Sequence, residues 1–305
     1  KRGLQKMKTN LIQDLNNIVT RLIDLGNYNT KGQVDGEDFQ FISTFEVYDA
    51  ADTSEKTVLE YKDKKYRMEF EKDFDGEYNK ALKDYMPNLL WGLDKSGVQD
   101  GEHIRLLIGL PISSLGQSDK IKADLVGKSF TFKTTEEKTI YIDEVVIVGE
   151  GISSYYMLPK EEREKDVILI DIGGRTTNVV EYKNKRIVNK DTFPVGTIDF
   201  YNRVKNKFNN EHGENVETHT IRHYIQTGVI PVYTELEDEF INELMNKIKT
   251  PFNLGLGKLI VFTGGGSIDF RRAIEEYNKN YKFLENPMHS NNKGKRRIAK
   301  AKGWL

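Results

Sequence analysis

Leu22-Ile23-Asp24-Leu25-Gly26-Asn27 lies early in the chain and returns, little changed, as Leu169-Ile170-Asp171-Ile172-Gly173-Gly174. A threonine follows each copy at the same offset, at positions 30 and 177. In both copies an apolar run typical of a strand ends in an aspartate and a glycine, and a short polar turn leads into a second strand. The repeat therefore predicts two similar halves, each presenting one such turn.

The chemistry of the repeated turn indicates a site for a metal ion and a phosphate. An aspartate at a strand end can reach a metal, and the glycine after it lets backbone N–H groups approach a phosphate. A single Asp-x-Gly is more often an ordinary turn or capping residue, but its duplication favours a functional pair. We expect Asp24 and Asp171 to hold Mg²⁺ through its waters, because Mg²⁺ gives up its hydration shell reluctantly.

Composition limits the classes of protein that the chain can represent. Its 305 residues exceed what one hydrophobic core usually sustains, so two domains are expected. The absence of cysteine excludes disulfides, thiolate metal sites and thiol catalysis. No stretch approaches the ~18 apolar residues of a membrane span, and no apolar signal-peptide core follows the first residues. We therefore expect a cytoplasmic protein that does not engage a membrane.

The 46 basic and 47 acidic residues nearly cancel, so little direct binding to DNA is expected. A local exception is the basic run at 293–302. We interpret it as the solvated face of a last helix in preference to an anion or partner site.

Strand and helix patterns alternate through the first half of the chain. A short helix at 6–17 precedes the first strand at 18–25 and is an extension without assigned chemistry. Further strands are predicted at 32–34, 39–45, 104–110 and 138–148, with a hairpin at 56–61 and 66–70. Helices are predicted at 77–95, where Pro87 could interrupt the helix, and at 150–158.

The same plan returns after a charged connector at 159–165. A strand at 167–172 is followed by a hairpin, 177–182 with 186–189, that turns at Asn184. Helices at 197–208, 216–227 and 234–249 precede a buried strand at 258–262, and one more helix follows. Alternating strands and helices in both halves place the chain in the α/β class.

Three further segments carry residues suited to a nucleotide. Lys31, seven residues after Asp24, would reach a phosphate if the chain turns back at 26–29; an exposed surface lysine is an equal alternative. Gly173, Gly174, Arg175, Thr176 and Thr177 form the second half of the phosphate cradle. Thr263-Gly264-Gly265-Gly266-Ser267 lies between a strand and a helix, and its three glycines indicate close approach of a flat group such as a purine.

Glu150 is the candidate for activating a water. It follows the strand at 138–148 and could orient or deprotonate a water that attacks the γ-phosphate. An acidic residue that satisfies a helix dipole is an equally good interpretation of its local sequence.

In this order the motifs resemble those of the actin-like ATPase superfamily. Asp24-x-Gly26 with Lys31 matches the phosphate-1 motif, Glu150-Gly151 connect-1, Asp171-x-Gly173-Gly174 phosphate-2 and Gly264-Gly265-Gly266 the adenosine motif. The resemblance implies a duplicated, ribonuclease H-like two-domain fold with nucleotide in the interdomain cleft. It implies an extension at 1–16, domain I at 17–158 with a small subdomain within about 38–75, and domain II at 159–290. A C-terminal helix at 291–305 would return to domain I.

The resemblance also implies roles for individual residues. Asp24 and Asp171 would place Mg²⁺, Lys31 would contact phosphate, and Glu150, acting with Asp171 in catalysis, would orient the water. Gly264 and Gly265 would pack on adenosine, and Gly196 would shape the nucleoside pocket. The remaining nucleotide-binding candidates are the neighbours of these residues in the same motifs: Gly26, Asn27, Tyr28, Asn29, Gly173, Gly174, Arg175, Thr176, Thr177, Gly266 and Ser267.

Within the superfamily, Gly196-Thr197-Ile198-Asp199-Phe200-Tyr201 is similar to the plasmid-segregating ParM group, especially its Gram-positive members. This resemblance implies an ATPase, using ATP or GTP with Mg²⁺, that polymerises into dynamic filaments and segregates plasmid DNA. Its partners would be other copies of itself and a DNA-binding adaptor on the plasmid centromere. The alternative is a small-molecule kinase of the sugar or acetate type, which shares the fold.

Overall fold

The computed structural model describes residues 18–48, 57–70, 72 and 84–305. The predicted helix at 6–17 lies outside these residues, as do part of the predicted helix at 77–95 and part of the small subdomain predicted within 38–75. In the part of the chain that is described, no helix is both long and apolar enough to cross a membrane.

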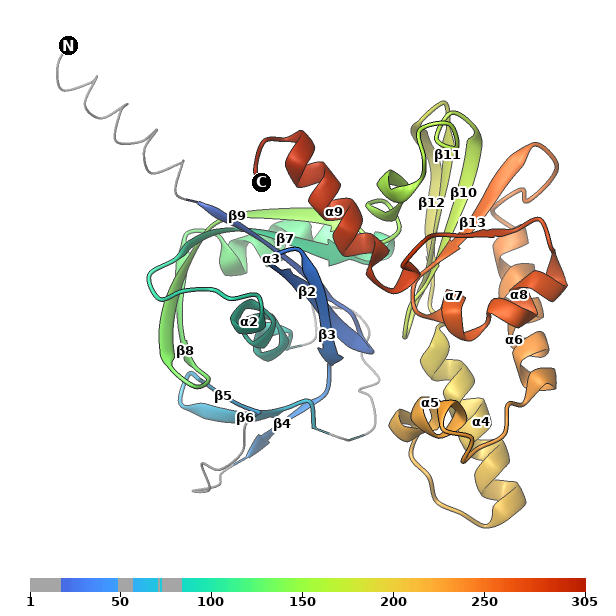
Figure 1. Ribbon diagram of the computed structural model, residues 1–305, viewed down its shortest axis with the longest axis horizontal. Coiled ribbons are helices and arrows are strands. Elements are labelled where there is room, and N and C mark those ends of the chain that lie inside the picture. Colours follow the sequence, from blue (N-terminus) through green and yellow to red (C-terminus); the bar gives the residue numbers. More distant parts are fainter. Residues whose placement is uncertain (1–17, 49–56, 71, 73–83) are drawn as a thin grey trace.

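The two copies of the repeat are strands of two different sheets (Figure 1). The first copy forms β1 (Val19–Leu25), which pairs in parallel with β7 (His103–Leu110). The second copy forms β10 (Asp166–Ile172), which pairs in parallel with β13 (Lys258–Thr263). Each sheet is therefore built outward from a repeat strand, as a duplicated fold requires.

The first sheet has the order β3-β2-β1-β7-β9-β8-β5-β6-β4. Its other strands are β2 (Asn29–Val34), β3 (Glu37–Ile42), β4 (Phe45–Tyr48), β5 (Val58–Tyr61), β6 (Lys64–Met68), β8 (Lys128–Lys133) and β9 (Glu137–Gly149). The strands predicted at 18–25, 104–110 and 138–148 are confirmed. Sequence analysis missed η1 (Ile112–Gln117), α3 (Ser118–Leu125) and β8, which lie between β7 and β9.

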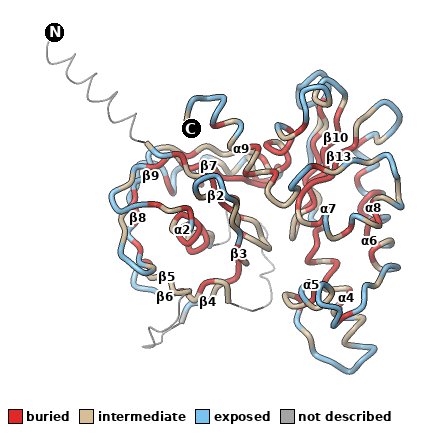
Figure 2. Tube along the Cα trace, in the orientation of Figure 1, coloured by how far each residue is buried: buried red, intermediate tan, exposed pale blue. Residues whose placement is uncertain are grey.

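This first sheet curls around α2 (Met86–Lys95), as Figures 1 and 2 show. Leu89, Leu90 and Leu93 of α2 are fully buried and form the centre of the first core. Pro87 stands in the first turn of the helix. The N–H groups of that turn have no acceptor within the helix, so proline loses no hydrogen bond there. It therefore begins the described helix and does not interrupt it.

The second sheet has the order β12-β11-β10-β13-β14. Its further strands are β11 (Thr177–Lys183), β12 (Arg186–Phe193) and β14 (Lys282–Phe283), and its helices are α4 (Thr197–His212), α5 (Thr218–Gln226), α6 (Thr234–Lys249), α7 (Gly266–Asp269) and α8 (Arg271–Tyr277). The predicted hairpin is confirmed, with Asn184 and Lys185 at φ 50° and 63° in its turn.

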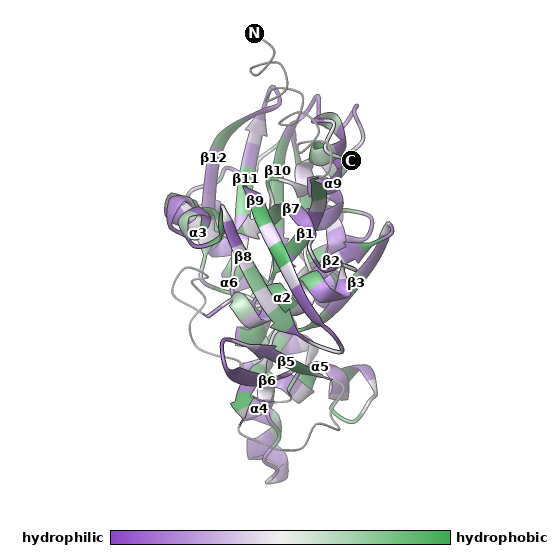
Figure 3. Cartoon of the chain, turned by 90° about the vertical axis from the view of Figure 1, so that its left-hand side faces the viewer, coloured by the Kyte–Doolittle hydropathy of each residue, from purple (hydrophilic) through white to green (hydrophobic). Residues whose placement is uncertain are grey.

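β10 is buried on both faces, which explains its continuous apolar sequence. Because side chains alternate along a strand, Ile168 and Ile170 pack with the helices of the second half, whereas Val167 and Leu169 pack on the opposite face. That opposite face is covered by Tyr155 and neighbouring residues that follow β9. Figure 3 shows the hydrophobic stretches of the central strands β9 and β10. The end of the first half thus packs directly on the second sheet.

The helix predicted at 150–158 is wrong. Gly151 has φ 78°, and the segment forms turns followed only by η2 (Ser154–Met157), a short 3₁₀ helix. The side chain of Asn291 accepts hydrogen bonds from the Gly151 N–H (3.0 Å) and from the hydroxyls of Ser153 (3.0 Å) and Ser154 (2.8 Å). A distant side chain therefore provides the bonds that fix this turn.

The last helix, α9 (Ser290–Ala301), follows η3 (Pro287–His289) and packs against both η2 and β1. Beyond the helix, the hydroxyl of Thr20 in β1 donates to the carbonyl of Trp304 at 2.8 Å. The last described segment thus lies between the two halves and against the first strand (Figure 1). The domain boundaries at 17–158, 159–290 and 291–305 remain predictions.

Candidate functional site

The two repeated turns face each other across one cleft. The β1–β2 hairpin lines it with Asp24, Gly26, Asn27, Tyr28, Asn29 and Lys31. Asp171, Gly173, Gly174 and Thr176 line it from the β10–β11 hairpin, and Gly264, Gly265 and Gly266 from the loop after β13. Glu150 lines it from the turn after β9. The structure therefore brings most of the predicted site residues together, while their functional roles remain predictions.

Two of the three candidate carboxyl groups are buried in the cleft, and the third, Glu150, is half-buried. Asp24 is 5% exposed and Asp171 is 4% exposed. Burial, followed by the nearby negative charge of Glu150, raises the pKa of Asp171 to about 7. A hydrogen bond from Asn291 and the positive charge of Lys31 act in the opposite direction. A cation entering the cleft would therefore relieve an electrostatic cost already present in the protein.

Direct coordination of a metal by several carboxylates does not fit the described residues. Among them, no three His, Asp or Glu side chains converge closely enough to hold an ion. Asp24 and Asp171 come from the two different sheets and both line the cleft. This pair fits a hydrated Mg²⁺, which keeps most of its waters and needs only one or two carboxylates.

Glu150 is held by a residue that sequence analysis missed. The amide nitrogen of Asn178 donates to Oε2 of Glu150 at 3.0 Å. The amide oxygen of Asn178 accepts from the Ile112 N–H (3.1 Å) and the Thr192 hydroxyl (2.7 Å). Because these bonds fix the orientation of the amide, the Glu150 carboxylate is aimed by the second hairpin although it follows the first sheet.

The glycines of the cleft are required by close approach. Gly264 has φ 81°, and a Cβ there would collide with the carboxylate of Asp171 and the carbonyl of Ile172. A Cβ at Gly174 would lie 2.8 Å from Cβ of Tyr28 in the opposite turn. At both positions neighbouring segments of the protein pack too closely for a side chain, so glycine is required.

Tyr28 crosses from the first hairpin into the second half. Its ring packs against the second core and meets Tyr201 edge to face, with centroids 6.2 Å apart. Burial raises the pKa of Tyr28 to about 12, so its phenol stays protonated. The two halves are therefore in contact at this point by an apolar ring as well as by backbone.

Four predicted nucleotide contacts do not line the cleft: Arg175, Thr177, Gly196 and Ser267. The Thr177 hydroxyl donates to the Val195 carbonyl at 2.8 Å, and that of Ser267 donates to the Gly264 carbonyl at 2.8 Å. Gly196 packs so closely on the backbone of Gly174 that a side chain there would collide with it. Thr177, Gly196 and Ser267 therefore support the loops that form the cleft, and contact of these residues or of Arg175 with a nucleotide remains a prediction.

No protein-family model and no curated protein matches the chain. Solved structures do. Ta0583, an archaeal actin homolog, is 20% identical, with a TM-score of 0.77 over 93% of this chain and 100% of that one. The pCBH ParM non-polymerisable quadruple mutant is 19% identical, with a TM-score of 0.75 over 93% and 100%. The AlfA filament bound to AMPPNP is 16% identical, with a TM-score of 0.65 over 93% and 98%.

The chain has the actin-like fold. In this fold the cleft between the two repeated hairpins is the place where residues from both halves can act on one ligand. The likeness is one of architecture, and the chemistry of the cleft has to be argued from this chain's own side chains.

Six further residues that line the cleft were not assigned to it from the sequence. Asn178, Thr197, Arg222, Asp269, Met288 and Asn291 also line it. Arg222 pairs with Asp269 at 2.8 Å, and Asp269 accepts a hydrogen bond from the Tyr201 hydroxyl at 2.8 Å. Two had a signal: Asn178 stands at the same offset from Asp171 as Lys31 from Asp24, and Thr197 directly follows Gly196. The others come from segments that only the tertiary structure brings to the cleft.

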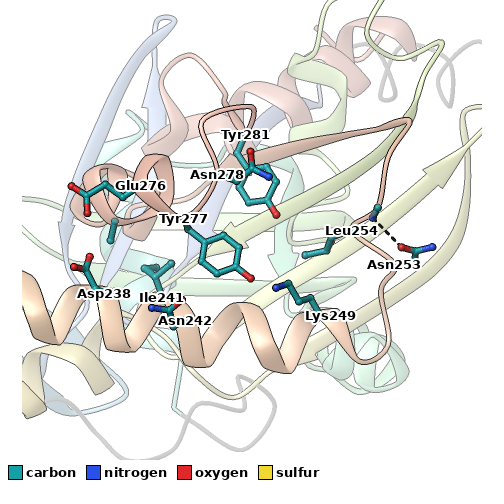
Figure 4. Close-up of a pocket in the computed structure, with 12 residues that line it drawn as sticks. Asp238, Ile241, Asn242, Lys249, Asn253, Leu254, Glu276, Tyr277, Asn278 and Tyr281 are labelled. Atoms are coloured by element: carbon teal, nitrogen blue, oxygen red, sulfur yellow. Dashed lines mark hydrogen bonds between the residues drawn. The ribbon is translucent and has the colours of Figure 1, made fainter.

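A second pocket lies in the second half, lined by α6, α8 and the segments that follow each of them (Figure 4). Lys249 lies over the ring of Tyr277, 4.8 Å from its centroid, and Asp238 is paired with Arg272 at 2.9 Å. Its charged groups are thus engaged with their neighbours, and no repeated motif contributes to it. The cleft, and not this pocket, is the candidate functional site.

Proposed function

We propose that this protein binds ATP or GTP with Mg²⁺ in the cleft and hydrolyses it to drive reversible assembly into filaments that segregate plasmid DNA. The observation that carries this proposal is the pair of buried aspartates, Asp24 and Asp171, at the ends of repeated strands on opposite sides of a glycine-lined cleft. Such a pair suits a ligand that carries both a divalent cation and several phosphates.

The structural relatives support nucleotide binding and self-assembly. Ta0583 forms a complex with ADP, and AlfA forms a filament bound to AMPPNP. Alp12 also forms a filament. A ligand held by residues of both halves would favour one arrangement of the halves, and a head-to-tail contact that does not close into a ring gives an open filament.

Each residue of the cleft has a role in this proposal. Asp24 and Asp171 would hold Mg²⁺ through its waters, and Lys31 would neutralise phosphate charge. Bound Mg²⁺ would offset the charge that develops on the phosphates. Glu150, oriented by Asn178, would position a water at the terminal phosphate. Gly264 and Gly265 would lie against the nucleoside, since both line the cleft.

The cellular role follows the resemblance to the ParM group. The formal net charge of −1 argues against strong direct DNA binding. A DNA-binding adaptor on the plasmid centromere would therefore connect the filament to its cargo in the cytoplasm.

Sedimentation and negative-stain microscopy with Mg-ATP, with Mg-GTP and without nucleotide test the proposal. Protein concentrations should run from below to above micromolar. Pelleting that depends on nucleotide and begins at a critical concentration is the expected result. A chain that stays monomeric in every condition, while phosphorylating a sugar or acetate, would instead establish the kinase alternative.

A further inference from the structure

Lys295 of α9 is a fully buried lysine at the edge of the cleft. Its side chain has no exposed surface. Its ammonium lies 3.4 Å from Oδ1 of Asp24 and donates to the carbonyl of Ile23 at 3.2 Å. Burial of a charged ammonium is costly unless it is paired. The ammonium of Lys295 is therefore paired with the end of β1 that carries Asp24.

The same helix contacts the other repeated aspartate. Asn291, four residues before Lys295, donates from its amide nitrogen to Oδ2 of Asp171 at 2.7 Å. Residues four apart lie on one face of a helix. One face of α9 thus reaches both aspartates, with an ammonium for Asp24 and a neutral amide for Asp171.

Two glycines make room for this arrangement. A Cβ at Gly294 would collide with the carbonyl of Ser153, so only glycine lets α9 approach this closely. A Cβ at Gly109 would lie 2.7 Å from Oδ1 of Asp24 and 3.6 Å from the Lys295 ammonium. The space around the ion pair is therefore closed by backbone and excludes a larger neighbour.

We propose that Lys295 is the resident counter-cation of Asp24: it positions this carboxylate while no metal is bound and competes with Mg²⁺ for it. Lys295 is in this sense a positioning residue that acts through Asp24. The part of the inference that concerns Mg²⁺ rests on the proposed function, whereas the coupling between the two side chains does not.

A double-mutant cycle tests the coupling without metal or nucleotide. Lys295→Met, Asp24→Asn and the double variant are unfolded in urea in the presence of a chelator. Lys295→Met should lower the folding equilibrium constant at least tenfold in the wild-type background, because it removes a buried positive charge from beside a buried carboxylate. In the Asp24→Asn background the same change should cost less than threefold. Lys300→Met, at an exposed position of the same helix, is the matched control and should have no effect.

Additive effects of the two substitutions would overturn the proposal. If Lys295→Met alone does not fold, the double variant must recover the folded signal, and its failure to do so would also overturn it.

A Mg²⁺ titration of ATP binding tests the competition. With a fluorescent ATP analogue as the probe, Lys295→Met should reach half-saturation at a Mg²⁺ concentration at least threefold below that of wild type and of Lys300→Met. An unchanged or higher Mg²⁺ requirement would exclude a competing cation. If wild type binds no Mg-ATP at all, the proposed function fails, and the cycle alone still decides whether Lys295 acts through Asp24.

Discussion

The turn after Asp24 and the turn after Asp171 share a backbone plan and differ in chemistry. In each hairpin the aspartate pairs across the strands with the residue seven positions later. That residue is Lys31 in the first hairpin and Asn178 in the second. One position of the repeat thus carries a cation in one half and an amide in the other.

This difference indicates that the two hairpins have different roles. Lys31 lines the cleft as a charge that can meet phosphate, whereas Asn178 holds the Glu150 carboxylate at 3.0 Å. The helix α9 repeats the distinction, because it offers Lys295 to Asp24 and Asn291 to Asp171. We infer that the first hairpin mainly binds and the second mainly orients, and the following predictions test that distinction.

The largest effect is expected from removal of the carboxylate that the second hairpin orients. Glu150→Ala should reduce ATP turnover by roughly 100-fold, the usual contribution of a positioned general base, while ATP affinity stays near that of wild type. Its filaments should persist longer after ATP addition. Steady-state turnover and nucleotide titration measure the two quantities, and an equal loss of binding and turnover would mark Glu150 as structural.

The two aspartates, one from each half of the protein, should both be needed for binding of Mg-ATP. Asp24→Ala and Asp171→Ala should each weaken Mg-ATP binding or hydrolysis at least ~10-fold, or about 1.4 kcal/mol. Each removes one of the two carboxylates available to the hydrated ion. Calorimetric titration with Mg-ATP measures the loss, and wild-type behaviour of both variants would refute the metal assignment.

The register partners should separate binding from turnover. Lys31→Met should raise the dissociation constant of Mg-ATP by about fivefold, close to 1 kcal/mol. The rate at which bound nucleotide is hydrolysed should change little. Asn178→Leu should lower the rate of hydrolysis with little change in affinity, because it removes the Asn178 hydrogen bond to Glu150 and no charge. Single-turnover kinetics distinguish the two, and the same profile in both variants would end the distinction between the hairpins.

The smallest effect concerns stability and pH in the absence of metal and nucleotide. The folded-state pKa of Asp171, about 7, lies above its ordinary value of 3.8. The folded protein thus retains a proton that the unfolded chain loses, and stability should fall as pH rises from about 4 to about 7. Between pH 6 and pH 8 this costs wild type on the order of 1 kcal/mol. In urea unfolding, the stability of Asp171→Asn should not show this dependence on pH. The same pH dependence in wild type and variant would show that Asp171 does not titrate in this pH range.

The sequence was informative where strands have a clear local pattern and where a motif is repeated along the chain. The strands β7, β10 and β13 were predictable because each is a largely buried apolar run, and β1 and β9 because they are rich in β-branched and other apolar residues. The carboxylates of Asp24 and Asp171 could be paired from the sequence alone because their hairpins repeat. Asn178 could have been found by extending that repeat by one more residue.

Other parts of the site depend on contacts between distant segments. The helix predicted at 150–158 failed because Asn291, far along the chain, takes the hydrogen bonds of that turn. Lys295 carries no local sign of burial, since it stands in a basic run that favours a solvated helix. The hydroxyls of Thr177 and Ser267 donate to the carbonyls of Val195 and Gly264, contacts that the sequence pattern could not show.

The ring of Tyr28 sets a rate as well as a contact. Widening the cleft at this point requires the Cβ and backbone of Tyr28 to move away from Gly174 and its ring to leave the second core. Tyr28 is half-buried, so exposing its ring costs at most the roughly 1.5–3 kcal/mol of a fully buried side chain of this size, which corresponds to a slowing of at most about one to two orders of magnitude. Entry and release of any ligand through this side of the cleft are then timed by the withdrawal of one aromatic side chain. Exchange should therefore be faster in a Tyr28→Ala chain even where affinity changes little.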